Sequence, residues 1–393
     1  MHRSSPRLRT AVPCTSPDAM SPSYAAGTSP RRTSSAHPSA RPRRRPTMPE
    51  TATVRAADEL VAAERDRSAE RARRADQRRR LLQNSGVLVP FLLVLIAGLA
   101  IVPNFASASN VTNMLVNAAI LAIVGYGMTL VIAVRGIDLS VGSAQALAAC
   151  VAAAAVNASG PLVGAAVGIA VGAALGLVNG LIVTQAKVPG FIGTLATMSV
   201  FRGAVLLFTG GAPIMIASAG FKDVATSSLL GIPVPFLIAV AAGGAMWFTL
   251  ERMRFGKHVV AVGGSPEAAV DTGISVNRVL LLSYLVAGAS AGVGGVLLAS
   301  QLGVVNGSVS AGLELQAIAI VVLGGTSMAG GRANIVGTFV AALLLAMINS
   351  GLNLLNVPSF YQYVALGLLL IFALSVDGAQ RAAVRRMLEG RLS

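Results

Sequence analysis

Charge is nearly absent from the last four-fifths of this chain, and that absence limits what it can fold into. The 313 residues after Arg80 contain only 13 lysines and arginines and 8 aspartates and glutamates. A soluble domain normally carries charge on about a quarter of its residues. This segment therefore cannot form a water-soluble surface, whereas a bilayer-embedded one is possible. We exclude a soluble enzyme.

After Gly86 the chain breaks into apolar runs separated by short polar or Pro/Gly-containing loops. The runs are continuous rather than alternating, which favours helices over a transmembrane barrel. The sequence predicts an all-α polytopic membrane protein with about ten transmembrane helices. The spans are expected near 87–103, 111–134, 141–158, 161–185, 190–209, 234–250, 279–300, 315–330, 334–352 and 360–376. The eighth is the weakest, because GGTSMAGG at 324–331 interrupts it.

Four segments follow from this pattern. Residues 1–48 form a Ser-, Pro- and Arg-rich tail that is expected to be disordered, and we favour a true translation start at Met48 or Met20 over an organelle transit peptide. Residues 49–85 are expected to form a charged cytoplasmic helix, 86–377 the transmembrane permease domain and 378–393 a basic cytoplasmic tail. With the N-terminal tail inside, eleven basic residues after it fall in inside segments and only Lys222 falls outside, which predicts that both termini are cytoplasmic.

Several classes of site are disfavoured. The net charge of +15 is concentrated in the tail and in membrane-flanking loops, so nucleic-acid binding is not expected. Two cysteines and three histidines outside the apolar runs provide no metal site. The chain has no phosphate-binding loop of the GxxxxGK[ST] type. The only ionisable candidates for ion coupling are Arg202, Asp138 and Glu314, which disfavours a self-powered transporter.

A glycine stripe and a faint repeat bear on architecture. Gly164, Gly168, Gly172, Gly176 and Gly180 recur at every fourth residue of one span; tight helix packing is the preferred interpretation, and a sliding surface is the alternative. In addition, residues 179–191 (NGL, then VPGF) resemble residues 349–360 (NSGL, then VPSF). These segments lie five spans apart, an odd offset, so the sequence predicts an inverted repeat.

Two groups of residues within or beside the spans are candidates for the translocation pathway. In GIDLSVGS, Asp138 or Ser140 can cap the following helix. Equally, a carboxylate at a span boundary between two glycines suits a hinge or broken helix better than proton transfer. The second group is polar residues within spans, for which interhelical hydrogen bonds are the commoner role. If several line one cavity, they suit a neutral polyhydroxy ligand; they are Asn117, Gln145, Asn179, Thr194, Gln316 and Asn349.

The longest inside loop, 251–278, is expected to contain a docking helix. Ser265 is suited to the N-cap, Pro266 to the first helical position, and Gly273 to the position after the last turn. So short a helix is marginal alone and gains stability by docking on a partner protein; a merely solvated loop is the alternative. The predicted contact residues are Gly264, Ser265, Pro266, Glu267, Ala268, Ala269, Gly273 and Ile274.

Three motifs, GIDLSVGS, GGSPEAAVDTGISV and LGGTSMAGGRANIVGT, together resemble the membrane permeases of bacterial ABC sugar importers of the ribose/xylose/galactose type. The resemblance covers roughly residues 86–377. It implies a transport subunit in the bacterial cytoplasmic membrane, surrounded by lipid, that is not itself an enzyme and binds no cofactor. It further implies a second permease copy or paralogue, two ATPase subunits that hold ATP and Mg and dock on 264–274, and an extracytoplasmic sugar-binding protein.

Two other functions remain open. A branched-chain amino acid permease is built in a related way, but it needs a site for an ammonium and a carboxylate, against which GIDLS and the amide-only span interiors argue. An ATP-independent facilitator would not need a docking helix in 251–278.

Overall fold

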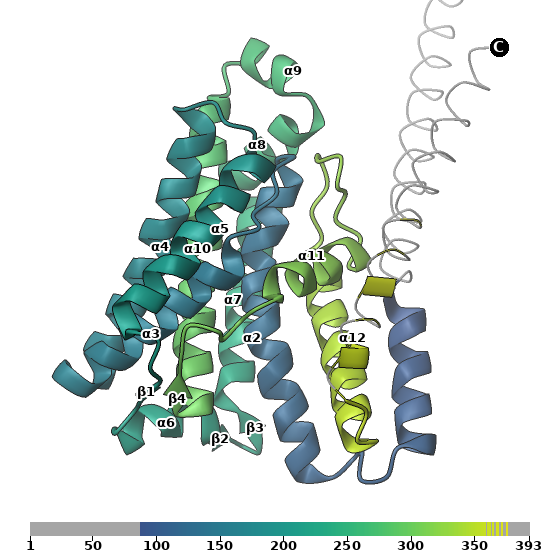
Figure 1. The fold of residues 1–393 in the computed structure, drawn as a ribbon. Coiled ribbons are helices and arrows are strands. Elements are labelled where there is room, and N and C mark those ends of the chain that lie inside the picture. Colours follow the sequence, from purple (N-terminus) through teal and green to yellow (C-terminus); the bar gives the residue numbers. More distant parts are fainter. Residues whose placement is uncertain are drawn as a thin grey trace, which may run out of the picture. The chain divides into compact units, whose positions relative to one another are not determined.

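The computed structural model describes residues 87–358 and, beyond them, only 360–362, 364, 367, 368, 371 and 375. The predicted tail 1–48, the charged helix 49–85 and the basic segment 378–393 lie outside the described residues, as does most of the predicted span 360–376. Within the described part the chain is a bundle of helices with a few two-residue strands (Figure 1).

Seven helices in the described part are long and apolar enough to cross a membrane, and all seven coincide with predicted spans. They are α2 (Ala108–Ala133), α3 (Val141–Ser159), α4 (Pro161–Thr184), α5 (Gly190–Thr209), α7 (Val234–Arg252), α10 (Val276–Leu302) and α12 (Ile335–Leu354). Two shorter apolar helices, Val87–Ile101 and α11 (Leu313–Leu323), accompany them. The chain is thus a polytopic helical membrane protein.

The predicted eighth span, 315–330, is wrong in its extent. Helix α11 has only 11 residues, which is ~16 Å of helix against a hydrocarbon core of ~30 Å. It ends where Gly324 packs against the backbone of Gly337 in α12. Residues 324–334 then form a hairpin in which Asn334 Nδ2 donates to Gly324 O at 2.8 Å. The apolar run is therefore a half-helix followed by a loop.

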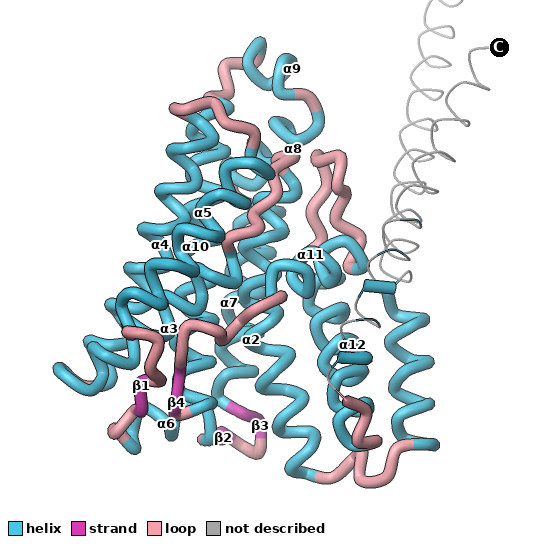
Figure 2. The backbone as a smooth tube through the Cα atoms, viewed as in Figure 1, coloured by secondary structure: helices cyan, strands magenta, loops and turns pink. Residues whose placement is uncertain are grey.

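The two ends of the bundle differ (Figure 2). One end carries α8 (Arg254–Gly264) and α9 (Pro266–Asp271) and is called the α9 end. The other, called the strand end, carries α6 (Ala219–Thr226) and two small antiparallel sheets. One sheet pairs β1 (Ile214–Met215) with β4 (Val304–Val305), and the other pairs β2 (Ser228–Leu229) with β3 (Ile232–Pro233).

The helices α2–α3–α4 and α10–α11–α12 form two corresponding sets. In each set a helix of 26 or 27 residues is followed by a non-helical segment and then by two more helices. Each long helix packs against the pair from the other set, α10 on α3 and α4 and α2 on α11 and α12, and the two long helices also pack on each other. This exchange of partners fits the predicted inverted repeat, which itself stays a prediction.

The segments that precede α3 and α11 contain the same local structure. Asp138 Oδ1 accepts hydrogen bonds from the backbone N–H of Ser140 at 2.8 Å and from its hydroxyl at 2.7 Å. Asn306 Oδ1 accepts the corresponding bonds from Ser308, at 2.9 and 2.7 Å. A carboxylate or amide followed two residues later by serine makes this turn in both sets, and this second match supports the repeat.

Both α3 and α11 begin inside the bundle rather than at its ends. The hydroxyl of Tyr284 donates to Ile137 O at 3.3 Å, and Tyr284 lies eight residues, ~12 Å, into α10. Gly142 at the start of α3 lies against Leu313 and Glu314 at the start of α11. Two broken helices, one entered from each end of the bundle, therefore meet in its interior.

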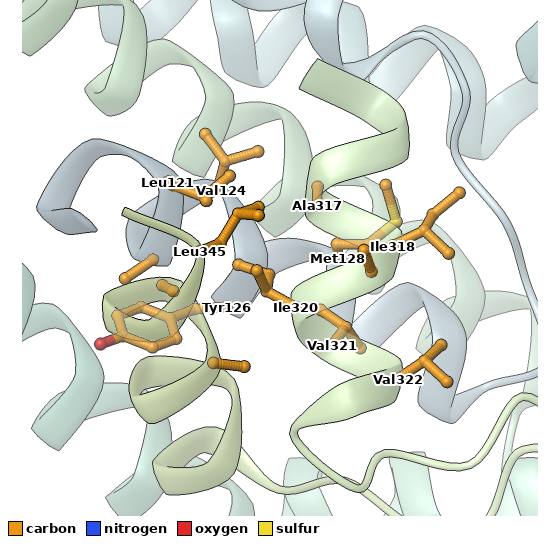
Figure 3. Close-up of a cluster of buried hydrophobic side chains, with 14 of the residues drawn as sticks. Leu121, Val124, Tyr126, Met128, Ala317, Ile318, Ile320, Val321, Val322 and Leu345 are labelled. Atoms are coloured by element: carbon orange, nitrogen blue, oxygen red, sulfur yellow. The ribbon is translucent and has the colours of Figure 1, made fainter. Parts of the chain in front are cut away.

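The core is built around α2, which is buried along most of its length. Figure 3 shows Leu121, Val124, Tyr126 and Met128 of α2 among residues of α11 and Leu345 of α12. Because nearly every side chain from Ala118 to Ala133 is buried, α2 has no polar stripe. A helix that is apolar on all sides is expected at the centre of such a bundle.

The glycine stripe of α4 packs on neighbouring helices, as preferred from the sequence. Gly172 and Gly176 lie directly against Gly288 and Gly292 of α10, backbone to backbone. The remaining stripe residues face α3 and other parts of α10. Small residues allow this close approach, and dispersion contacts between the helices follow from it.

Candidate translocation cavity

A cavity of about 590 Å³ lies among α2, α3, α10, α11 and α12. Four of the predicted pathway residues, Asn117, Gln145, Gln316 and Asn349, line it together. The sequence reasoning missed the other polar lining residues, which are Asn110, Asn113, Gln301, Ser310, Ser350, Asn353 and Gln362. Nine of the nineteen described lining residues are amides, and none is charged.

The polar groups of this cavity are only partly satisfied by one another. Gln301 Nε2 donates to Asn117 Oδ1 at 3.1 Å, and Ser350 Oγ donates to Asn110 Oδ1 at 2.6 Å. Within the described part, three buried lining atoms have no hydrogen-bond partner: Gln145 Nε2, Gln301 Oε1 and Ser310 Oγ. A buried polar atom without a partner costs about 1–3 kcal/mol, so these atoms are available to a ligand or to water.

The remaining predicted pathway residues form a separate cluster. Asp138, Ser140, Asn179 and Thr194 lie together where the segment before α3 meets α4 and α5, and all four are buried. Asn179 Nδ2 donates to Ser140 Oγ at 2.7 Å and approaches Asp138 Oδ2 at 3.4 Å. Thr197, which the sequence reasoning did not select, donates to Asn179 Oδ1 at 2.7 Å.

The polar groups of this second cluster are hydrogen-bonded to one another and to nearby backbone atoms. Thr194 Oγ1 accepts from Leu139 N and bonds to Ile137 O, both at 3.1 Å. The expectation that the side chain of Asp138 or Ser140 caps α3 is wrong. Ser140 is the N-cap residue but its side chain makes no capping bond, and Asp138 instead accepts from Ser140 itself. The cluster therefore holds the broken helix before α3 in one conformation.

Arg202, the basic residue inside a predicted span, holds the other broken segment. Its guanidinium NH1 donates to Gly307 O at 2.7 Å and Val309 O at 3.0 Å, which are carbonyls just before α11. Arg202 and Glu314 also line a smaller cavity of about 430 Å³ beside α5 and α11. Arg202 therefore has a structural role, because it donates to backbone carbonyls that would be hydrogen-bonded within a continuous helix.

The predicted docking helix is present as α9. Ser265 is its N-cap, with Oγ accepting from Ala268 N at 3.3 Å, and Pro266 is the first helical residue. Gly273 follows the helix with φ +80°, and Ile274 N donates to Ala269 O at 2.9 Å, which is the C-terminal bond pattern expected of a helix ended by glycine.

The faces of α9 differ in what they can contact. Glu267, Ala268 and Gly273 are exposed, as a docking surface requires. Ala269 is buried in a cluster with Val259 and Val262, so it attaches α9 to the bundle and cannot meet a partner. The pKa of the Glu267 carboxyl is lowered by its own backbone N–H and by the Ser265 hydroxyl, with a further contribution from Arg135. Glu267 is therefore ionised at neutral pH.

Metal binding has no support in the described residues, among which no group of three histidine, cysteine, aspartate or glutamate side chains is close enough to hold an ion.

A family model and curated relatives both match this chain, and both are permease components of transport systems. Residues 110–374 match the family model described as the branched-chain amino acid transport system / permease component. The ribose import permease protein of Bacillus subtilis is 43% identical over 295 residues, covering 74% of this chain and 91% of that protein. The ribose import permease protein of Escherichia coli K12 is 40% identical over 299 residues, with coverage of 74% and 92%.

Another relative carries a different sugar name. The L-arabinose ABC transporter permease protein of Azospirillum brasilense is 36% identical over 309 residues, covering 78% of this chain and 91% of that protein. No solved structure matches the chain. The relatives named here are thus sugar permeases, although the family model is described by branched-chain amino acids.

Proposed function

Because the chain belongs to this family of ABC importer permeases, we propose that it translocates a monosaccharide across the bacterial cytoplasmic membrane. The observation that carries the proposal is the uncharged, amide-lined cavity. Amides both donate and accept, so they can exchange hydrogen bonds with a ring of hydroxyl groups. A volume of about 590 Å³ is within the usual range for small-molecule sites, roughly 300–1,000 Å³.

The same cavity argues against a branched-chain amino acid. The ammonium and carboxylate of such a substrate require charged or strongly dipolar partners in a site shielded from water. Among the described lining residues none carries a charge. The family model's description keeps amino acids as an outcome of the test below, while the chemistry of the lining favours a neutral polyhydroxy ligand.

The proposal includes partner subunits. Two permease copies each present an exposed face of α9, and one ATPase subunit docks on each. The ATPase subunits hold ATP and Mg, and their closure shifts the permease between states with different affinity for substrate. A sugar-binding protein delivers substrate at the strand end. Basic residues near the two ends of the bundle support this orientation. Arg254 and Lys257 in α8, Arg278 in the first turn of α10 and Arg135 beside Gly263 lie at the α9 end, whereas Lys222 in α6 lies at the strand end. Both termini are then cytoplasmic.

Uptake by cells with and without the gene tests the substrate class. Labelled ribose, arabinose, allose and leucine are the substrates, measured before and after ATP depletion. We expect the loss of one sugar in the deletion strain, and expect that uptake to be sensitive to ATP depletion. Loss of leucine uptake alone would transfer the chain to the amino acid class, and uptake that survives ATP depletion would identify a facilitator.

Alanine substitution tests the cavity itself. Gln145→Ala, Gln316→Ala and Asn349→Ala each remove one amide from the lining, whereas Asn277→Ala removes an exposed amide in the first turn of α10. Each lost hydrogen bond to a neutral ligand is worth about 1 kcal/mol, so we expect the uptake rate at sugar concentrations well below saturation to fall about fivefold. Wild-type rates for all three cavity variants would remove the cavity from the pathway.

A further inference from the structure

Three segments that are distant in sequence meet at the α9 end. They are the last turn of α2, the junction between α8 and α9, and the hairpin 324–334 that precedes α12. Gly331 N donates to Ala133 O at 2.9 Å. Arg135 Nε donates to Gly263 O at 2.7 Å, and its NH2 group donates to Gly264 O. One arginine thus connects α2 to the junction, and one backbone bond connects α2 to the hairpin.

The packing at this point leaves no room for slippage. A Cβ added to Gly263 would overlap both Ala133 O and the backbone nitrogen of Gly331. A Cβ added to Gly330 would lie 2.7 Å from Gly263 O and would also overlap the side chain of Arg135. Because these neighbours are mostly backbone atoms, the three segments are in direct contact. A side chain added at either glycine could not be accommodated by changing the rotamer of a neighbouring residue.

The conformation of Arg135 itself points to a specific role. Its φ is +66°, in the left-handed region that glycine or asparagine adopts at lower cost. A residue is kept in such a conformation when its surroundings hold it there. Here the guanidinium fork, which can donate several parallel bonds, is occupied by the carbonyls of the residues immediately before α9.

Below this junction the contacts continue to the cavity. Leu130 and Ala133 of α2, Val262 of α8 and Ala269 of α9 belong to one buried apolar cluster, against which Ala333 of the hairpin also packs. Further along, Thr129 of α2 and Thr338 of α12 bond through their hydroxyls at 3.1 Å. Helices α2 and α12 then run on to the cavity, which they line with Asn117 and Asn349.

We propose that Arg135 is a positioning residue that clamps the α8–α9 junction to the end of α2, to which the backbone bond of Gly331 also holds the 324–334 hairpin. A displacement of α9 then moves α2 and α12 together instead of bending the 251–278 loop that contains α9. Contiguous packed and hydrogen-bonded contacts are the physical basis for such transmission. This inference rests on the proposed function in one respect, the docking of an ATPase on α9.

The first test is the number of sugars transported per ATP hydrolysed by the complete importer in proteoliposomes. For Arg135→Ala we expect ATP hydrolysis to persist while sugar transported per ATP falls at least fivefold. Arg135→Lys, which keeps the charge but not the planar fork, should recover part of the ratio. Arg278→Ala, which removes an exposed charge at the same end, should keep the wild-type ratio. An unchanged ratio in Arg135→Ala would overturn the proposal.

The second test does not depend on the Arg135 variants folding. Spin labels are placed in otherwise wild-type importer at Asp271→Cys, an exposed α9 position outside the predicted docking residues, with Ala329→Cys in the hairpin, and separately at Asp271→Cys with Ser227→Cys at the strand end. Cys14→Ser removes the tail thiol, and Cys150 is buried. On nucleotide trapping we expect the 271–227 distance to change and the 271–329 distance to stay constant.

Two outcomes of the distance measurement overturn the clamp. Either the 271–329 distance changes as much as the 271–227 distance, or neither distance changes. Failure of the proposed function would be seen differently, as the absence of sugar transport or of bound ATPase in the wild-type complex.

Discussion

Replacement of Gly288 by alanine tests the backbone-to-backbone contact between α4 and α10. A Cβ at this position would lie 2.6 Å from both Cα and N of Gly176 in α4 and would overlap Gly172 O. Non-bonded carbon atoms normally approach to about 3.5–4.0 Å. Because all three neighbours are backbone atoms, α4 and α10 must move apart by ~1 Å along their most extensive contact.

The magnitude follows from two opposing effects. Inserting a methyl group into a well-packed interior typically costs about 1–3 kcal/mol, and rigid backbone neighbours place this site in the upper part of that range. Alanine also stabilises a helix interior relative to glycine by about 0.5–1 kcal/mol. We expect Gly288→Ala to lower the free energy of unfolding by about 1–2 kcal/mol.

The matched control is Gly244→Ala in α7, where an added Cβ meets no atom within 4 Å. Only the helix-propensity effect operates there, so the free energy of unfolding should be unchanged or slightly higher. Both purified variants and the wild type are unfolded by increasing sodium dodecyl sulfate in mixed micelles and followed by circular dichroism. Equal shifts in the two variants, or a stabilised Gly288→Ala, would refute the packing argument.

Two further substitutions test the broken helix before α3 and the docking helix. Asp138→Ala removes the acceptor for the buried Ser140 N–H and hydroxyl and should cost roughly 2–6 kcal/mol, taking about 1–3 kcal/mol for each group left unpaired. Asp138→Asn keeps an acceptor oxygen and should cost less in the same unfolding assay. Glu267→Arg reverses the exposed charge on α9 and should abolish sugar uptake while membrane insertion, assayed by fractionation and immunoblot, is retained. Normal ATP-dependent uptake by that variant would exclude Glu267 from docking.

Most of the helices could be predicted because each is an apolar run of suitable length bounded by polar or Gly/Pro residues. The runs at 190–209 and 161–185 coincide with α5 and α4 almost to the residue. The run at 315–330 could not be treated in the same way. Hydropathy reports how apolar a segment is but not whether the chain reverses at Gly324, and a half-helix with its hairpin has the same composition as a short span.

The polar residues predicted to line the pathway fall into two separate groups in the structure, and sequence could not distinguish the groups for a similar reason. Asn117, Gln145, Gln316 and Asn349 share a cavity, whereas Asn179 and Thr194 are held by Asp138 and its neighbours. All six are polar residues in apolar runs, and nothing in their local sequence separates the two groups. The separation depends on the exchange of partners between α2 and α10, which is a long-range property. One signal was available: the Asn306–Ser308 spacing matches Asp138–Ser140 and marks the second broken helix.

The exchange of partners also determines the order in which the protein can be completed as it is made. The glycine face of α4 has its principal partner in α10, which begins only at Val276. During synthesis α3 and α4 must therefore remain in the bilayer with that face against lipid until α7, α8 and α9 have emerged. Likewise α2, the most buried of the seven candidate spans, acquires its full cover only when α7, α10, α11 and α12 follow. Neither set of helices should form a stable core alone, and a chain cut between them should assemble only when both pieces are produced together.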